Sequence, residues 1–313
     1  MKYSIILPVY NVKEYLQECL DSIYSNQYDD FELICIDDGS TDGSFQWLIE
    51  NESKYPRMKY VQLEHIGISG VRNYGIQECS GDYICWIDSD DCISKNFFST
   101  IDNILFESNC NCIQIGWTRK KDELFHEKLI DKEEIKLISK ENFNREILLS
   151  KRPCYCWSII TKKQYYYTIN YPIGHSFEDL NQNHHLIQNI RGDIALVQIP
   201  LYFYRDNISS IVNTINTKKR IDIFMAWEDR CKFAKEYYHY LYNECYNQFI
   251  ISSYLVCLSY LKEKYVFKKD IRIFFDSFKI NKIYSNNLPI YKKIVIVCIY
   301  ILAYLKYSIK NLM

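Results

Sequence analysis

Four consecutive residues, Asp88-Ser89-Asp90-Asp91, are the clearest candidates for chemistry in this chain. They follow Tyr83–Ile87, an apolar run that predicts a buried strand. Asp88 and Asp90 lie one residue apart at the strand end, so we expect both to reach the same ligand space. Carboxylates this close together favour a hard cation such as Mg2+ or Mn2+, whose other ligands are phosphate and water oxygens. Ser-Asp-Asp is also common in turns, so the cluster alone leaves a purely structural turn as the alternative.

The elements that would position this cluster alternate regularly over the first 117 residues. Short apolar runs predict strands, and segments with apolar residues at helical spacing predict the helices between them. Strands buried on both faces indicate an α/β fold with a Rossmann-like, doubly wound and mostly parallel sheet. Ligands bind such sheets at the carboxyl ends of the strands, where Asn11, Asp37, Asp38 and the acidic cluster all fall. The expected strands are Tyr3–Val9, Phe31–Ile36, Met58–Leu63, Tyr83–Ile87 and Cys112–Trp117, and the expected helices are Lys13–Ser25, Asp42–Glu50 (capped by Thr41 or Asp42), Ile68–Cys79 and Lys95–Glu107.

The remainder of the chain has a different character. Residues 118–150 are highly charged and predict a surface insertion with a helix or two, and a further helix is expected near Glu178–Gln188. After Asn213 the pattern is helical. We therefore expect one domain over residues 1–212 and a helical C-terminal region over 213–313.

The last helix contains twelve consecutive apolar or tyrosine residues, Ile294–Leu305, flanked by lysines that include Lys292 and Lys306. This run is short of the roughly 20 residues needed to span a bilayer. Residues 290–310 therefore predict either an interfacial helix whose lysines reach anionic headgroups, or a C-terminal helix buried against its neighbours.

Composition narrows the class of protein. The net charge is −1, so we expect no nucleic-acid partner. The thirteen cysteines are scattered, and Met1-Lys2-Tyr3 runs directly into a strand without a secretory signal pattern. These features predict a reducing, cytoplasmic setting. An interfacial helix over residues 290–310 would place the protein at the cytoplasmic face of the inner membrane.

Four segments together resemble the family 2 inverting glycosyltransferases, which have a GT-A fold. They occur in family order and at family spacing within the first 91 residues, and the resemblance covers roughly residues 1–210. The segments are Ser4-Ile-Ile-Leu-Pro8-Val-Tyr10-Asn11, Ile36-Asp37-Asp38-Gly-Ser-Thr-Asp42, Gly67-Ile-Ser-Gly-Val-Arg72-Asn73-Tyr-Gly75 and Trp86-Ile-Asp88-Ser-Asp90-Asp91.

The resemblance implies a role for each matching residue. Asp38 would accept hydrogen bonds from the uracil edge, Asp88 would contact the ribose, and Asp90 would ligate Mn2+ or Mg2+. Arg72 would lie near the nucleotide or the acidic cluster, although a helix-surface salt bridge is the alternative. The remaining residues of the nucleotide-sugar site would be Pro8, Val9, Tyr10, Asn11 and Ser89.

Two later segments also match the family. Inversion needs a base that removes the proton of the acceptor hydroxyl. The family places it in a Glu-Asp pair, which fits Asp179 as the base, assisted by Glu178; the same residues suit the first turn of a helix. Arg205, in Tyr204-Arg205…Ser209, would approach the diphosphate or form a structural ion pair.

The implied function is a metal-dependent, hexosyltransferase-type enzyme. It would move one sugar from a UDP-sugar to a hydroxyl of a glycan acceptor, either free or lipid-linked, during assembly of capsule, lipopolysaccharide or other surface polysaccharide. The sequence leaves two alternatives: an inactive nucleotide-sugar-binding or scaffold module, and a sugar nucleotidyltransferase. The latter should carry a glycine-rich, basic signature where this chain has Tyr10-Asn11-Val12-Lys13.

Overall fold

A computed structural model describes residues 2–125, 130, 132–207, 215–263, 266, 268–278, 281–284 and 288–312. The chain divides into two compact units. The first comprises residues 1–174 and 182–208, and the second comprises residues 175–181 and 209–313. The expected domain boundary at residue 212 lies outside the described residues and stays a prediction.

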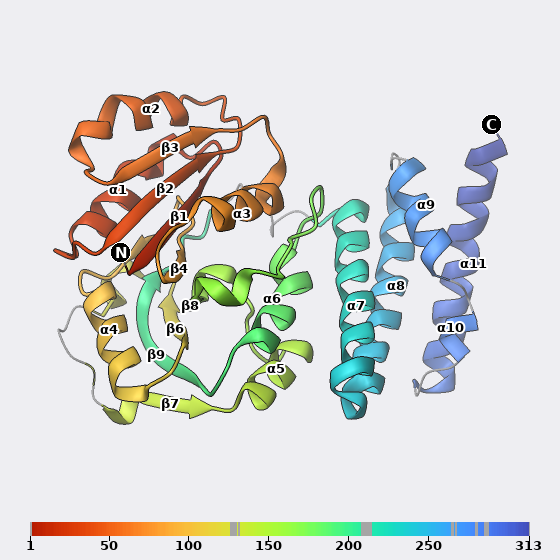
Figure 1. The fold of residues 1–313 in the computed structure, drawn as a ribbon. Coiled ribbons are helices and arrows are strands. Elements are labelled where there is room, and N and C mark those ends of the chain that lie inside the picture. Colours follow the sequence, from red (N-terminus) through yellow and green to blue (C-terminus); the bar gives the residue numbers. More distant parts are fainter. Residues whose placement is uncertain are drawn as a thin grey trace. The chain divides into compact units, whose positions relative to one another are not determined.

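The first unit is built on a mixed sheet, which has nine strands over the described residues (Figure 1). Its order is β3-β2-β1-β4-β8-β6-β9-β5, with β7 also paired to β9. The neighbours from β3 to β4 are parallel, as is the pair β6–β9. The pairs β4–β8, β6–β8, β5–β9 and β7–β9 are antiparallel. The strands are β1 (Tyr3–Val9), β2 (Phe31–Asp37), β3 (Met58–Gln62), β4 (Tyr83–Trp86), β5 (Cys92–Ile93), β6 (Cys112–Thr118), β7 (Ile135–Ile138), β8 (Ile159–Lys162) and β9 (Ile194–Phe203).

Helices cover this sheet with their apolar faces. In α1, Leu16, Cys19, Leu20 and Ile23 recur at helical spacing and are all buried. Helix α3 packs on β1 and β2, and α4 packs on β6 and β9. The α-helices are α1 (Lys13–Tyr24), α2 (Ser44–Asn51), α3 (Gly67–Glu78), α4 (Phe97–Ser108), α5 (Lys140–Leu148) and α6 (Glu178–Asn189). Helix α6 begins in the second unit. The short 3-10 helices are η1 (Glu52–Lys54), η2 (Lys121–Glu123), η3 (Lys132–Glu134), η4 (Cys156–Ser158) and η5 (Lys163–Tyr166).

The predicted fold class, an α/β sheet followed by helices, is confirmed. Two local expectations were wrong. Helix α2 begins after Gly43, which has a φ of 87°, and Asp42 instead accepts the Ser44 N–H at 2.9 Å. The charged stretch 118–150 is more than a surface insertion, because β7 joins the sheet and α5 buries Phe143 and Ile147.

A buried carboxylate ties together the amino ends of the first strands. Glu32 on β2 is 2% exposed and accepts hydrogen bonds from Ser4 Oγ at 2.7 Å, Ser80 N at 2.6 Å and Ser80 Oγ at 2.8 Å. Lys59 Nζ of β3 lies 2.9 Å from the same carboxylate. These bonds lower the pKa of Glu32 to about 2, because they favour the ionised form more than burial disfavours it.

The second unit is helical over its described residues. Helix α7 packs along α8 and against α9, and α11 packs on α8 and α10. Its elements after residue 214 are α7 (Thr217–Tyr237), η7 (His239–Leu241), α8 (Tyr242–Lys262), α9 (Lys268–Ser277), α10 (Asn281–Tyr284) and α11 (Ile290–Leu312).

Helix α11 has two apolar faces. Ile296, Tyr300 and Ala303 are buried, whereas Ile294, Val295, Ile301, Leu302 and Leu305 are exposed. The expectation that Lys306 reaches lipid headgroups was wrong, because its Nζ donates to backbone carbonyls at the end of α8, including that of Glu263 at 2.8 Å. Within the described residues, every helix falls short of the combined length and hydrophobicity that a membrane crossing requires.

Candidate active site

The acidic cluster follows β4 at the carboxyl end of the strand, as the sequence predicts. Asp88 and Asp90 are half-buried and Asp91 is buried. Burial, together with the neighbouring charges of Asp88 and Asp90, raises the pKa of Asp91 to about 9. The loop therefore concentrates negative charge at a partly accessible position.

The carboxyl end of β9 braces this loop. Tyr202 Oη donates to Asp91 Oδ2 at 2.7 Å and accepts the Asp88 N–H at 3.0 Å. The Arg205 N–H donates to Asp91 Oδ1 at 2.7 Å, and Arg205 Nε donates to the Asp90 carbonyl at 2.6 Å. Asn207 Nδ2 lies 3.3 Å from Asp90 Oδ2. The side chains of the cluster are therefore held from a segment more than one hundred residues later in the chain.

Arg205 forms the structural ion pair that was one of its two expected roles. Its Nη2 donates to Glu18 of α1, and its guanidinium lies over the rings of Tyr15 and Phe203, 5.0 and 5.1 Å from their centroids. A hydrogen bond from Lys121 lowers the pKa of Glu18, and Arg205 lowers it further. Arg205 thus links α1 to the acidic loop. Ser209, which belongs to the same family segment, lies outside the described residues.

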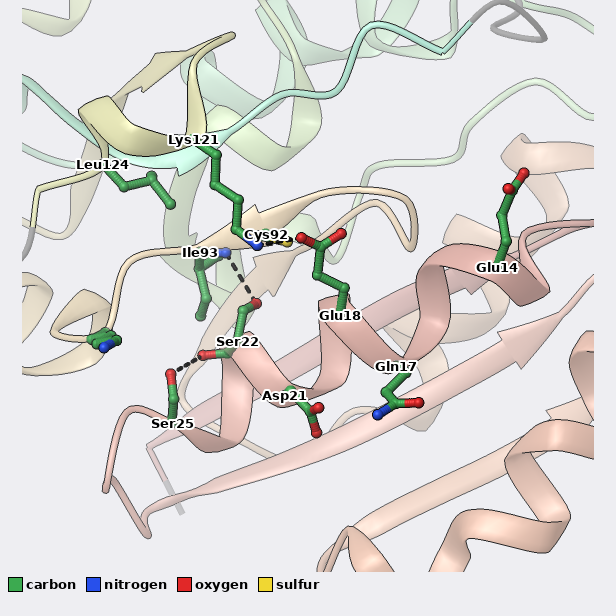
Figure 2. Close-up of a pocket in the computed structure, with 11 residues that line it drawn as sticks. Glu14, Gln17, Glu18, Asp21, Ser22, Ser25, Cys92, Ile93, Lys121 and Leu124 are labelled. Atoms are coloured by element: carbon green, nitrogen blue, oxygen red, sulfur yellow. Dashed lines mark hydrogen bonds and ion pairs between the residues drawn. The ribbon is translucent and has the colours of Figure 1, made fainter.

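Glu18 also lines a groove behind the acidic loop (Figure 2). Figure 2 shows Glu18 and Lys121 facing each other, with Ser22 bonded to the backbone of Ile93. The groove has a volume of about 590 Å³. The sequence-predicted site residues do not line it. It therefore lies beside the acidic loop without being the expected nucleotide site.

Arg72 lies where the family resemblance places it. Its Nη2 is 3.8 Å from Asp88 Oδ1, and its guanidinium packs 4.9 Å from the centroid of the Trp86 ring. The side chain is buried, so the alternative of a helix-surface salt bridge was wrong. A buried, fixed cation beside a carboxylate can offset negative charge on a bound diphosphate.

Asp38 is buried at the amino end of α3. Its Oδ1 accepts the Ile66 N–H at 2.7 Å, and its Oδ2 accepts the Gly67 N–H at 3.0 Å. His65 Nδ1 lies 3.1 Å from Oδ2, and the His65 ring stacks on Tyr10 with the centroids 4.6 Å apart. Carboxylate oxygens have further lone pairs, so this geometry is compatible with a bond from a base edge.

The other expected nucleotide residues differ in their exposure. Tyr10 and Asn11 are exposed, and Asn11 Oδ1 accepts the Thr41 N–H at 2.8 Å. Pro8 is partly buried, whereas the side chains of Val9 and Ser89 are buried. The carbonyl of Val9 accepts the Asp38 N–H at 2.8 Å. Val9 and Ser89 thus shape the backbone, and Tyr10 and Asn11 present side chains to solvent.

Asp37 forms the turn after β2. Its Oδ1 accepts the N–H groups of Gly39 and Ser40 at 3.1 and 3.0 Å, together with Gln62 Nε2 at 3.0 Å. These bonds make Asp37 a turn residue beside the site.

The expected base pair, Glu178 and Asp179, opens α6. Glu178 is buried and Asp179 is half-buried, with Asp179 Oδ1 accepting the Leu180 N–H at 2.6 Å. Residues 175–181 group with the second unit, whereas the acidic loop lies in the first. The roles of Asp179 as base and Glu178 as its assistant therefore stay predictions.

The donor set of the acidic loop suits a divalent cation. Asp88 and Asp90 offer hard, partly accessible oxygens, and the raised pKa of Asp91 indicates that their negative charge is only partly compensated. Asp90 would hold Mn2+ or Mg2+, and bound diphosphate would supply further oxygens.

The family model described as Glycosyl transferase family 2 matches residues 4–167, slightly more than half of the chain. The chain belongs to glycosyl transferase family 2. This region contains the strand ends, Arg72 and the acidic loop described above.

This family 2 chain is 29% identical over 220 residues to the glycosyltransferase GlyA of Streptococcus pneumoniae, covering 65% of the chain but only 30% of GlyA. It is 24% identical over 247 residues to the putative glycosyltransferase EpsH of Bacillus subtilis, covering 74% of the chain and 69% of EpsH. A crystal structure of S. aureus TarS (residues 1–349) with UDP-GlcNAc aligns over 96% of the chain and 79% of that structure, with a TM-score of 0.60 and 18% identity.

Sequence reasoning missed three residues of this family 2 site. Glu18 and Asn207 had no local signal, because each acts only through a distant partner. Tyr202 lies in the family segment that ends in Arg205, and its position three residues before that arginine was the available signal.

Proposed function

We propose that this chain is an inverting glycosyltransferase that moves one sugar from a UDP-sugar to a hydroxyl of a glycan acceptor during surface polysaccharide assembly. The observation that carries the proposal is the acidic loop Asp88–Asp91, held by Tyr202 and Arg205 and faced by the buried Arg72. Family membership supports the reaction class. Relatives that include a poly(ribitol-phosphate) beta-glucosyltransferase and a minor teichoic acid biosynthesis protein support a surface glycan as the setting.

The proposed chemistry is a single displacement. Asp179 accepts the proton of the acceptor hydroxyl while that oxygen attacks the anomeric carbon. The bond between the sugar and the diphosphate breaks on the opposite face, and UDP leaves with its electron pair. Arg72 lies beside Asp88 and offsets charge on the departing diphosphate. When bound at Asp90, Mn2+ or Mg2+ would supply further neutralisation of that charge.

A uridine donor is supported by two independent points. Asp38 presents acceptor oxygens beside the exposed Tyr10 ring, which suits the N–H edge and the face of a small base. TarS, whose fold this chain shares, has been crystallised with UDP-GlcNAc and with UDP. A Pyrobaculum calidifontis mannosyltransferase crystallised with GDP-Man and Mn2+ also shares the fold, at a TM-score of 0.51, so GDP-sugars belong in the test.

The test is turnover of UDP- and GDP-sugars by the full chain, with and without Mn2+. We expect metal-dependent release of UDP, and losses of at least about a hundredfold in Asp90→Ala and Asp179→Asn. Asp90→Ala should weaken Mn2+ binding, whereas Asp179→Asn should not. Asp82→Asn is the matched control, because Asp82 is exposed and precedes the same strand. Full metal-dependent activity in Asp90→Ala would refute the proposal.

We also propose that α11 lies on an anionic membrane surface, where a lipid-linked acceptor is presented. Its exposed stripe includes Ile294, Ile301, Leu302 and Leu305, and the sequence of α11 contains lysines but no acidic residue. Lys292, exposed at the start of the helix, supplies charge complementarity to the lipid.

Vesicle co-sedimentation tests this surface. Binding to phosphatidylglycerol vesicles, but not to phosphatidylcholine vesicles, is expected. It should fall in the variant Ile294→Ser/Ile301→Ser/Leu305→Ser, which leaves the buried face of α11 intact. Equal binding to both vesicle types, or a stable dimer that the triple variant dissociates, would contradict the membrane assignment.

A further inference from the structure

The segment that carries the proposed base is anchored to helix α7. Asp222 of α7 is buried, and its carboxylate accepts the Ser176 N–H at 3.0 Å and contacts His175 Nδ1 at 2.7 Å. Two turns later, Arg230 is fully buried and its Nε donates to the Leu180 carbonyl at 2.9 Å. These contacts lie within the second unit and hold residues 175–181 on both sides of Asp179.

The segment of residues 175–181 contains a strained backbone position. Phe177 has a φ of 60°, in the left-handed region that non-glycine residues rarely adopt. Such a conformation costs on the order of 1 kcal/mol or more and persists when surrounding contacts enforce it. This residue immediately precedes Glu178 and Asp179. The bonds from Asp222 and Arg230 flank it and are suited to hold it.

Both α7 residues are themselves held in place. The guanidinium of Arg230 packs 5.0 Å from the centroid of the Trp227 ring, and Lys218 Nζ lies 3.6 Å from Asp222. A buried carboxylate and a buried guanidinium are expensive to desolvate unless their bonds are made. The Asp222 carboxylate and the Arg230 guanidinium are both bonded to residues 175–181. Packing an apolar helix face does not require two buried charged groups of this kind.

We propose that Asp222 and Arg230 are positioning residues for the catalytic base. This inference rests on the proposed function, because it takes Asp179 as the base. The helical region then fixes the position of the group that receives the acceptor proton, and leaves binding of the nucleotide to the sheet. A small displacement of a base lowers turnover strongly, whereas donor binding does not depend on it.

The experiment compares Asp222→Ala, Asp222→Asn and Arg230→Met with wild type in the full chain. UDP-sugar turnover with Mn2+, with water or a glycan as acceptor, provides kcat and donor KM, and calorimetry provides the Kd of UDP. We expect kcat to fall at least tenfold in Asp222→Ala and Arg230→Met, with KM and Kd within twofold. Asp222→Asn keeps an oxygen for the Ser176 amide and should recover most of the activity. Glu228→Ala is the control, because Glu228 lies on α7 but pairs with Lys232 and Lys282.

Hydrogen–deuterium exchange supplies a readout that does not depend on activity. Peptides covering residues 175–181 should exchange faster in Asp222→Ala than in wild type or Glu228→Ala. Unchanged exchange, or faster exchange with kcat within twofold of wild type, would overturn the inference. If Asp222→Ala fails to fold, Arg230→Met decides the question by the same criteria. A wild-type protein without metal-dependent turnover would instead refute the proposed function, and the exchange result would still report on the anchor.

Discussion

Replacing Glu32 by glutamine removes the charge from the carboxylate that joins β1, β2 and the segment before β4. The hydrogen-bonding groups that converge on this carboxylate, from Ser4, Ser80 and Lys59, are positioned to donate. The three serine bonds end on Oε1 and the Lys59 bond ends on Oε2, so the single oxygen of glutamine can accept only one of these two sets. Because Glu32 is 2% exposed, water cannot replace the lost bonds.

The magnitude follows from the pKa. Glu32 has a pKa of about 2 in the folded protein against an ordinary value of 4.5. At 1.36 kcal/mol for each pKa unit, its ionisation contributes about 3 kcal/mol to the free energy of unfolding at neutral pH. Among the bonds that lower this pKa, the one from Lys59 contributes most, and those from Ser4 and Ser80 supply the rest.

The pH dependence has a definite sign. The folded pKa is depressed, so the contribution is complete above about pH 4.5 and is lost as the pH falls toward 2. Urea unfolding followed by tryptophan fluorescence should therefore give a difference between wild type and Glu32→Gln of about 3 kcal/mol at pH 7 that shrinks steadily below about pH 4.5.

The control is Asp29→Asn, which breaks an ion pair with Arg57 in which the aspartate is 89% exposed. It should change stability by less than about 0.5 kcal/mol at any pH. A difference for Glu32→Gln that is below about 1 kcal/mol at pH 7, or that stays constant between pH 6 and pH 3, would refute the reasoning.

Three further outcomes follow from the first unit. Gly116→Ala should destabilise the protein by about 3 kcal/mol in urea unfolding, because the added Cβ would lie 2.4 Å from two backbone oxygens of β9. Gly192→Ala is the control: the space around Gly192 is open and its φ is 85°, so the substitution should cost only about 1 kcal/mol. Tyr202→Phe removes the hydroxyl that bonds to the acidic loop, so calorimetry should show Mn2+ binding weakened about tenfold. Glu18→Gln removes the ion pair with Arg205 and should weaken Mn2+ binding about threefold. This loss is smaller than that of Tyr202→Phe, because Glu18 reaches the acidic loop only through Arg205. A larger loss in Glu18→Gln than in Tyr202→Phe would contradict this ranking.

The parallel half of the fold was predictable because its signals are local. Strand β1 has the predicted bounds, Tyr3–Val9, since a strand covered on both faces reads as a continuous apolar run. Strand β5 was missed because Cys92–Ile93 is too short to show any period. Strand β7 was missed because Ile135–Ile138 lies in a charged stretch and joins the sheet through β9.

The residues of the site also divide into those with a local sequence signal and those whose partners lie far along the chain. Asp38, Arg72 and the acidic cluster each lie at a strand end or in a family motif, so they could be located from neighbours in the chain. The bonds of Arg205 to Glu18, and of Lys306 to the end of α8, depend on partners far along the sequence. Long basic side chains reach such partners only after the tertiary structure is formed, so the identity of these partners carried no sequence signal.

The brace on the acidic loop has a consequence for how the protein folds. Tyr202 and Arg205 lie 111 and 114 residues after their partner Asp91. Contacts of such sequence separation carry a large loop-closure entropy and form late. During synthesis, β1 to β4 can pair as soon as they emerge, but the geometry of Asp88–Asp91 must wait for β9. The nascent amino-terminal half would thus be a folded sheet without an organised donor site, and affinity for donor would arise in one step when β9 docks.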